Sequence, residues 1–218
     1  ITSYVAPVSG EAVTFNNALS AHVVVSAVIS VPKIFPTIQD AIDAAYSGDT
    51  IFVSEGTYTE GQINVDKSLT LLANGTVIVD GLQKGHVFYV TANNVTIKGF
   101  MILNSSTSWS IFSGVYLDKV QNCKIESNTI ANTSTGIHVR DSDGNYICAN
   151  NIAKDASKDL WAWCGIHLWD SGRNTLRENN VSGCEFNFFV LGTYLSDFIQ
   201  DIDSVSYTHL TLPTNREV

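Results

Sequence analysis

The chain has 218 residues, enough for one domain of ordinary size, and only 15% of them are charged. A formal net charge of −9 without a local basic run argues against binding to nucleic acid or to an anionic membrane surface. No apolar stretch approaches the roughly 20 residues that cross a bilayer, so membrane insertion is not expected.

The first predicted element is a short helix over about residues 37–46. Thr37 is a suitable N-cap, and Gly48 is expected to stop the helix. Residues 1–32 lie outside the pattern described below, and we interpret them as a leading strand or the end of a preceding domain. After the helix, GDTIFVSEGTY and SLTLLANGTVIVDG predict the first strands. One apolar stripe of the helix is expected to pack on them: Ile38, Ala41, Ile42 and Ala45.

An internal repeat follows. GVYLDKVQNCKIESNTIANT, GIHVRDSDGNYICANNIAKD and GIHLWDSGRNTLRENNVSGC begin at Gly114, Gly136 and Gly165, and a weaker copy begins near residue 86. Polar residues separate the aliphatic positions, which is the alternation typical of short strands with one buried face. Four positions are aliphatic in all three copies: Val115, Ile137 and Ile166; Leu117, Val139 and Leu168; Ile125, Ile147 and Leu176; and Ile130, Ile152 and Val181.

One such copy is too small to bury a core of its own, so the copies must stack on one another. Asn128, Asn150 and Asn179 align at the same bend of each copy. An inward Asn that bonds the equivalent Asn of the next turn would satisfy buried backbone groups there. We therefore predict a structural asparagine ladder.

These residues resemble the right-handed parallel β-helix proteins of the pectin-lyase-like superfamily, especially the NosD-like and the carbohydrate-binding and sugar-hydrolase repeats. The resemblance covers about residues 33–200. It implies an all-β, right-handed parallel β-helix with a short N-terminal capping α-helix, in a domain of residues 33–203. It also implies an extracellular, cell-surface or periplasmic location. The helix would cover the open edge of the stack.

Two surplus segments, residues 103–113 and 153–164, fall at one corner of the stack. They contain Trp109, Trp161 and Trp163, and Trp169 lies on the strand after the second segment. Loops on a rigid scaffold often carry function, and exposed aromatic rings can stack on sugars. The alternative is that these rings fold back and cover the sheet.

The strand after this corner should carry two outward columns. Tyr116, His138 and His167 form one column, and Asp118, Arg140 and Trp169 form the other. The two histidines could share a metal or bind a substrate, while Asp141, Asp170 and Arg140 could form a catalytic group. Stacked carboxylates also suit Ca²⁺, for which the candidates are Asp141, Asp143 and Asp170.

Three functions follow from these residues. The first is a module that binds polysaccharide through Trp109, Trp161, Trp163, Trp169 and the Tyr116, His138 and His167 face. The second is a polysaccharide lyase or glycosidase acting on acidic glycans, although the Asp-Asp and Gly-His-Gly elements of polygalacturonases are absent. The third, implied by the NosD resemblance, is a copper-associated role. Asn-X-Ser/Thr sequons also occur, at Asn74, Asn94, Asn104, Asn132 and Asn180.

The repeat pattern stops after Asp203. Within residues 204–218, the segment VSYTHL resembles a translated end of a sequencing-library transposon. We therefore expect this tail to be non-native and the chain to be a metagenomic fragment, either a monomer or part of a longer solenoid.

Overall fold

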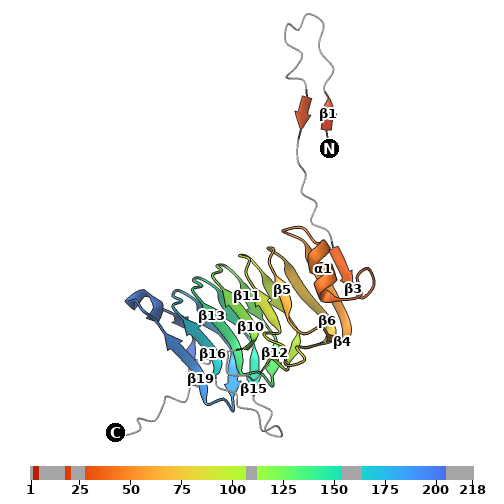
Figure 1. Ribbon diagram of the computed structural model, residues 1–218. Coiled ribbons are helices and arrows are strands. Elements are labelled where there is room, and N and C mark those ends of the chain that lie inside the picture. Colours follow the sequence, from red (N-terminus) through yellow and green to blue (C-terminus); the bar gives the residue numbers. More distant parts are fainter. Residues whose placement is uncertain (1, 5–17, 21–27, 107–111, 154–163, 205–218) are drawn as a thin grey trace, which may run out of the picture.

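In the computed structural model, residues 2–4, 18–20, 28–106, 112–153 and 164–204 are described. Their main feature is a stack of turns that runs from α1 at one end to β19 at the other (Figure 1). Each complete turn contributes three short parallel strands, such as β10 (Ser113–Asp118), β11 (Lys124–Glu126) and β12 (Thr129–Ala131). The fold is the predicted all-β, right-handed parallel β-helix with a single α-helix.

Six strands form one face of the described stack. In spatial order they are β5 (Ile63–Val65), β7 (Phe88–Val90), β10, β13 (Thr135–Arg140), β16 (Cys164–Trp169) and β19 (Phe186–Leu191).

A second sheet wraps the other two faces, because its long strands β4 (Thr50–Thr59) and β6 (Thr70–Asp80) pass from one face to the next. The first part of β6 pairs with β8 and its second part pairs with β9. One face continues through β8 (Thr96–Lys98), β11, β14 (Tyr146–Cys148), β17 (Thr175–Arg177) and β20 (Asp201–Ile202). The other continues through β9 (Met101–Leu103), β12, β15 (Asn151–Ala153) and β18 (Asn180–Ser182).

The sheet begins before residue 33, because β3 (Val28–Val31) pairs in parallel with β4. A strand therefore leads the β-helix from within residues 1–32. Farther upstream, β1 (Thr2–Tyr4) and β2 (Ala18–Ser20) pair with each other in antiparallel orientation. At the other end, the 3₁₀ helix η1 (Leu195–Phe198) separates β19 from β20.

The predicted aliphatic register is confirmed. Val115 pairs with Ile137, which pairs with Ile166, and the other aligned sets pair in the same way. All of these side chains are buried in one continuous core. Because each strand alternates inward and outward positions, this register also aligns the outward side chains of successive turns.

Two inward amide ladders support the bends. Asn150 donates its backbone N–H to Asn179 Oδ1, and its own Oδ1 accepts the backbone N–H of Asn128. This is the ladder expected from the repeat. A second ladder, in which Asn145 donates to Asn174 Oδ1 and Asn174 donates to Gln200 Oε1, was not predicted.

Helix α1 (Ile38–Ala44) covers the N-terminal end of the stack. Thr37 caps it as predicted, its Oγ1 accepting the Asp40 backbone N–H at 3.0 Å, and the expected apolar stripe is buried. The helix ends before Gly48, since Ala45 has left the helical conformation. Lys67 donates to the carbonyl oxygens of Ile42, Asp43 and Ala45, which satisfies orphan acceptors at this end.

Candidate functional site

The outer surface of the six-stranded face carries a continuous stack of rings. The outward residues are aligned in the order Asn64, Tyr89, Tyr116, His138, His167 and Phe189. Tyr116 lies 4.8 Å from His138 between ring centroids, His138 lies 4.4 Å from His167, and His167 lies 5.3 Å from Phe189. The predicted column therefore exists, and it extends over more turns than the sequence indicates.

Most of this column is buried. The exposed fractions are 8% for Tyr116, 2% for His138 and 1% for His167. These three side chains point away from the solenoid core, but they do not form the open face that direct ligand binding requires. The interpretation of these residues as a ligand-contacting surface is therefore corrected: the rings pack on one another, and large rings in register favour such packing over exposure.

Burial also keeps the histidines of this stack neutral. It lowers the pKa of His167 to about 4, and it lowers the pKa of His86 to about 4 against the opposing effect of Asp118. His86 stacks on Tyr116 at 4.4 Å, and its Nδ1 accepts the backbone N–H of Ser113. An acceptor nitrogen exists only in the neutral imidazole, so this hydrogen bond agrees with the lowered pKa.

The paired histidines do not have the geometry of a chelating metal site. His138 and His167 are stacked with an angle of 15° between their ring planes. A ligating lone pair lies in the plane of its own imidazole ring, so two stacked rings do not converge on one ion. Within the described ranges, no three His, Cys, Asp or Glu side chains lie close enough together to hold a metal.

The accessible part of this face is the edge where the strands end. Asp118, Arg140 and Trp169 are aligned there, as predicted. The Tyr89 hydroxyl donates to Asp118 Oδ2 at 2.7 Å, and this bond, with burial, raises the pKa of Tyr89 to about 12. We call Tyr89, Asp118, Arg140 and Trp169 the Trp169 edge.

Arg140 occupies the centre of the Trp169 edge. Its guanidinium carbon lies 4.9 Å from the centroid of the Trp169 ring, a cation–π contact. Its Nε lies 3.5 Å from Asp141 Oδ2, and its hydrogen bond to Tyr116 is the main cause that raises the pKa of Arg140. The side chain remains 46% exposed, so a ligand can still reach the guanidinium.

The three candidate carboxylates for Ca²⁺ do not converge. Asp141 faces Arg140, whereas Asp170 Oδ1 accepts the backbone N–H of Thr193. Asp143 instead accepts the Gly172 backbone N–H at 2.7 Å and pairs with Arg173 at 2.8 Å. Asp141 and Asp170 do occupy equivalent turns, with φ of 49° and 47°.

The three loop tryptophans, Trp109, Trp161 and Trp163, lie outside the described residues. Tyr89 and His86 were missed because the turn between β7 and β8 is one residue shorter than the equivalent turn between β10 and β11. Tyr89 pairs with Tyr116, at an offset of 27 residues, whereas Ile97 pairs with Ile125, at an offset of 28. Aligning the strand and the turn separately would have placed Tyr89 in the column.

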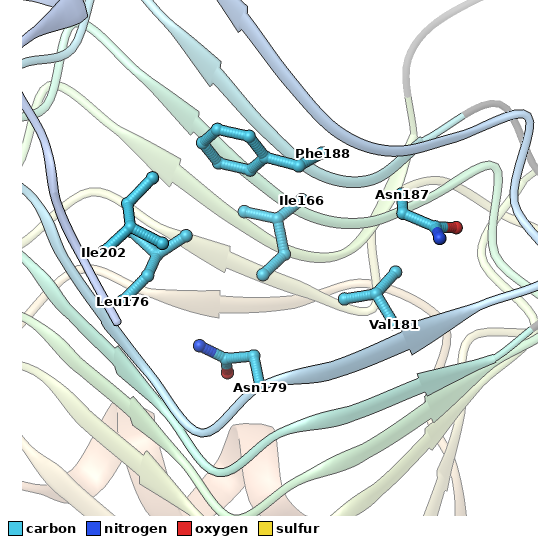
Figure 2. Close-up of a pocket in the computed structure, with 7 residues that line it drawn as sticks. All are labelled: Ile166, Leu176, Asn179, Val181, Asn187, Phe188 and Ile202. Atoms are coloured by element: carbon cyan, nitrogen blue, oxygen red, sulfur yellow. The ribbon is translucent and has the colours of Figure 1, made fainter. Parts of the chain in front are cut away.

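A small pocket at the C-terminal end of the stack belongs to the core (Figure 2). Its lining consists of inward residues from the last turns, most of them apolar, as the view of their converging side chains shows. The lining residues are Ile166, Leu176, Asn179, Val181, Asn187, Phe188 and Ile202. It contains no ionisable side chain and is not a candidate for catalysis.

The stacked parallel turns, the asparagine ladders and the helix-capped end define a right-handed parallel β-helix protein. A family model described as "Periplasmic copper-binding protein (NosD)" matches residues 10–180, and the chain belongs to this NosD family. The expected extracellular, cell-surface or periplasmic location agrees with this membership. Among the described residues, no helix is long and apolar enough to cross a membrane.

Individual proteins are also similar. The chain is 33% identical over 187 residues to a cell surface glycoprotein of Methanothermus fervidus, a match that covers 70% of this chain and 29% of the relative. The chain thus spans less than a third of that relative's length. Two crystal structures of a pectin methylesterase from Aspergillus niger align with TM-scores of 0.39 and 0.38, at 15% and 14% identity. They cover 82% and 74% of this chain, and 81% and 68% of theirs.

Proposed function

We propose that this chain is a β-helix module outside the cytoplasm that binds a polysaccharide along the Trp169 edge. The observation that carries the proposal is the register of this edge: successive turns present Asp118, Arg140 and Trp169 at equivalent positions. Neighbouring strands are roughly 4.8 Å apart, so these groups form a row along the stack. A polymer of repeating sugars suits a row of repeating contacts.

The side chains of the edge match the chemistry of a sugar. Carboxylates such as Asp118 accept hydrogen bonds from hydroxyl groups, Arg140 donates to ring and hydroxyl oxygens, and an aromatic side chain such as Trp169 packs against the apolar C–H face of a sugar ring. The buried rings beneath the edge hold these groups on a rigid surface. Tyr116 thus acts as a positioning residue for Arg140.

Charge favours a neutral glycan over an acidic one. The carboxylates of Asp118, Asp141 and Asp170 lie at or next to the edge, and Arg140 already contacts Asp141. A uronate polymer would bring further carboxylates to this surface, in a chain with a formal net charge of −9.

Affinity electrophoresis in gels that contain neutral or uronate polysaccharides tests the proposal. The wild type should be retarded by at least one neutral polysaccharide, and Trp169→Ala should weaken binding about tenfold or more, since stacking aromatics dominate such contacts. Tyr46→Ala is the control, because Tyr46 is 79% exposed beyond α1, away from the edge. Retardation of neither class, or equal retardation of Trp169→Ala and the wild type, would refute the proposal.

The loop tryptophans give a second arm of this experiment. If the surplus segments contribute to the same surface, Trp161→Ala with Trp163→Ala should also weaken retention in the gel. An undiminished affinity would remove these two residues from the binding surface and leave the edge itself as the site.

The enzymatic alternative uses the same edge. Asp141, Asp170 and Arg140 would then supply acid, base and charge stabilisation to a bound uronate polymer. Release of unsaturated or reducing ends, lost in Asp170→Asn, is the result that favours a lyase or glycosidase. Unchanged turnover in Asp170→Asn removes these residues from catalysis.

The family description names copper, and the described donor set does not match it. Soft or imidazole ligands that converge on one point are the usual copper site. Here His138 and His167 are stacked, and no group of three donors is found among the described residues. We therefore derive no copper chemistry for this chain.

A further inference from the structure

Five sequons remain that polysaccharide binding does not explain. N-glycosylation requires an asparagine amide nitrogen that faces solvent and a hydroxyl residue two positions later. A glycan is also bulky, so the modified residue must leave the fold intact. The five asparagines, Asn74, Asn94, Asn104, Asn132 and Asn180, can be sorted by these requirements.

Asn74 meets all of them. It lies where β6 bends from one face of the solenoid to the next, and the whole tripeptide of Asn74, Gly75 and Thr76 is exposed. Gly75 has a φ of 90°, which turns the chain outward at this bend. Within the part of the chain that the structure describes, no side-chain hydrogen bond holds the Asn74 amide.

Asn94 meets them at a different corner, between β7 and β8. It is exposed with a φ of 58°, a left-handed conformation that asparagine tolerates better than most residues. Its backbone N–H donates to the Gln121 carbonyl, so the turn is held by the backbone. Neighbouring Asn93 supplies the side-chain contact, accepting the Gln121 N–H, and in the described structure the Asn94 amide has no such bond.

The other three sequons are engaged in the fold. Ser106, the hydroxyl residue of the Asn104 sequon, is 8% exposed, and the Asn132 amide oxygen is buried. The Asn180 amide nitrogen is exposed but donates to Asn151 Oδ1 at 3.0 Å. All three have serine as the hydroxyl residue, whereas the two open sequons have threonine.

We propose that Asn74 and Asn94 are the N-glycan acceptor sites of this protein and that the fold protects the other three sequons. The donor is an oligosaccharide linked to a lipid pyrophosphate. The amide nitrogen forms a bond with the anomeric carbon of the donor sugar, and the bond from that carbon to the pyrophosphate oxygen breaks. Its electron pair leaves with the lipid pyrophosphate, and the amide loses one proton.

The test is glycosylation of the folded chain by a single-subunit oligosaccharyltransferase with its lipid-linked oligosaccharide, followed by mass spectrometry of the glycopeptides. Synthetic peptides that span each sequon serve as unfolded acceptors. The folded chain should carry glycan at Asn74 and Asn94 only, while the peptides that contain Asn104, Asn132 and Asn180 are modified. Thr76→Ala should remove only the glycan at Asn74, and Thr96→Ala only the glycan at Asn94.

Two results would overturn the proposal. One is a folded chain that is unmodified at Asn74 and Asn94 although the matching peptides accept glycan. The other is glycan on Asn104 or Asn132 in the folded chain at the level found in the peptides, which would show that the fold does not select among the sequons.

Discussion

At the residue scale, single buried amides hold the bends of the solenoid. Asn150 donates from its backbone and from Nδ2 to Asn179 Oδ1, donates from Nδ2 to the Ile125 carbonyl, and accepts from Asn128. No other side chain of this size offers both donors and acceptors in one plane. The alignment of asparagines in the repeat predicts this ladder because every turn needs the same bonds.

Asn150→Ala should therefore destabilise the protein strongly. It leaves the buried Asn128 N–H and Ile125 carbonyl without their partner, and the expected loss is about 3 kcal/mol in the free energy of unfolding. Asn151→Ala, at the exposed next position, is the control and should change stability by less than about 0.5 kcal/mol. Equal effects of the two substitutions in urea unfolding would contradict a structural role of the ladder.

The buried histidines predict a loss of stability in mild acid. The pKa of His167 is about 4 in the folded chain and 6.5 in the unfolded chain. The unfolded chain thus binds more protons between these values, so the contribution of His167 is complete above pH 6.5 and disappears as the pH falls toward 4. After allowance for solvent screening we expect about 1–2 kcal/mol.

His167→Phe isolates this effect, because phenylalanine matches Phe189 in the next turn and does not titrate. The difference in unfolding free energy between pH 7 and pH 4.5 should be smaller in His167→Phe than in the wild type by about 1–2 kcal/mol. The carboxylates titrate in both proteins and cancel in this comparison. An identical pH dependence of the two proteins would mean that His167 is not held neutral by the fold.

At the element scale, α1 is a short helix that the next turn holds at both ends. Glu60 accepts the backbone N–H groups of Ile38 and Gln39, at 2.7 and 2.9 Å, and Lys67 accepts none but donates to three carbonyls at the opposite end. Each charge is placed to oppose the helix dipole. The N-cap and the apolar stripe were predictable from local sequence, whereas these contacts come from residues more than 20 positions away.

Glu60→Gln should loosen the start of α1, since an amide offers one acceptor oxygen where the carboxylate offers two. We expect a local loss of about 1–2 kcal/mol, which corresponds to hydrogen exchange roughly 5 to 30 times faster at the Ile38 and Gln39 amides. The matched control is Glu55→Gln, at an exposed position of β4. Unchanged exchange at both amides in Glu60→Gln would show that the carboxylate does not cap the helix.

At the scale of the whole molecule, the two ends of the stack differ. The N-terminal end is covered by α1, whereas exposed large apolar side chains gather around η1 near the C-terminal end (Figure 1). These side chains are Leu191, Tyr194, Leu195, Phe198 and Ile199. An apolar patch beside strand edges promotes association.

We therefore expect the chain to self-associate as its concentration rises. Leu195→Lys with Ile199→Lys should reduce this association, because two charges are placed on the patch, and light scattering at increasing concentration measures it. Ile34→Lys is the control, since Ile34 is exposed at the opposite end. A wild type that stays monomeric at every concentration would contradict the role of the patch.

The sequence predicts the fold better than the site for a physical reason. Inward positions such as Val115, Ile137 and Ile166 repeat because every turn must fill the same core, so their pattern is visible in the chain itself. Outward positions obey no such requirement. His138 and His167 are aligned as predicted, but their burial depends on contacts across turns, which no local pattern reports.

Hydrogen–deuterium exchange with and without a retarding polysaccharide tests the central claim, that the ligand binds at the Trp169 edge. We predict slower exchange at the turns that follow Asp118, Arg140 and Trp169, whose backbone amides at Lys119, Asp141 and Asp170 bond the neighbouring turns. Exchange at α1 and on the β9 to β18 face should not change. Protection on that opposite face, with none at the Trp169 edge, would contradict the account.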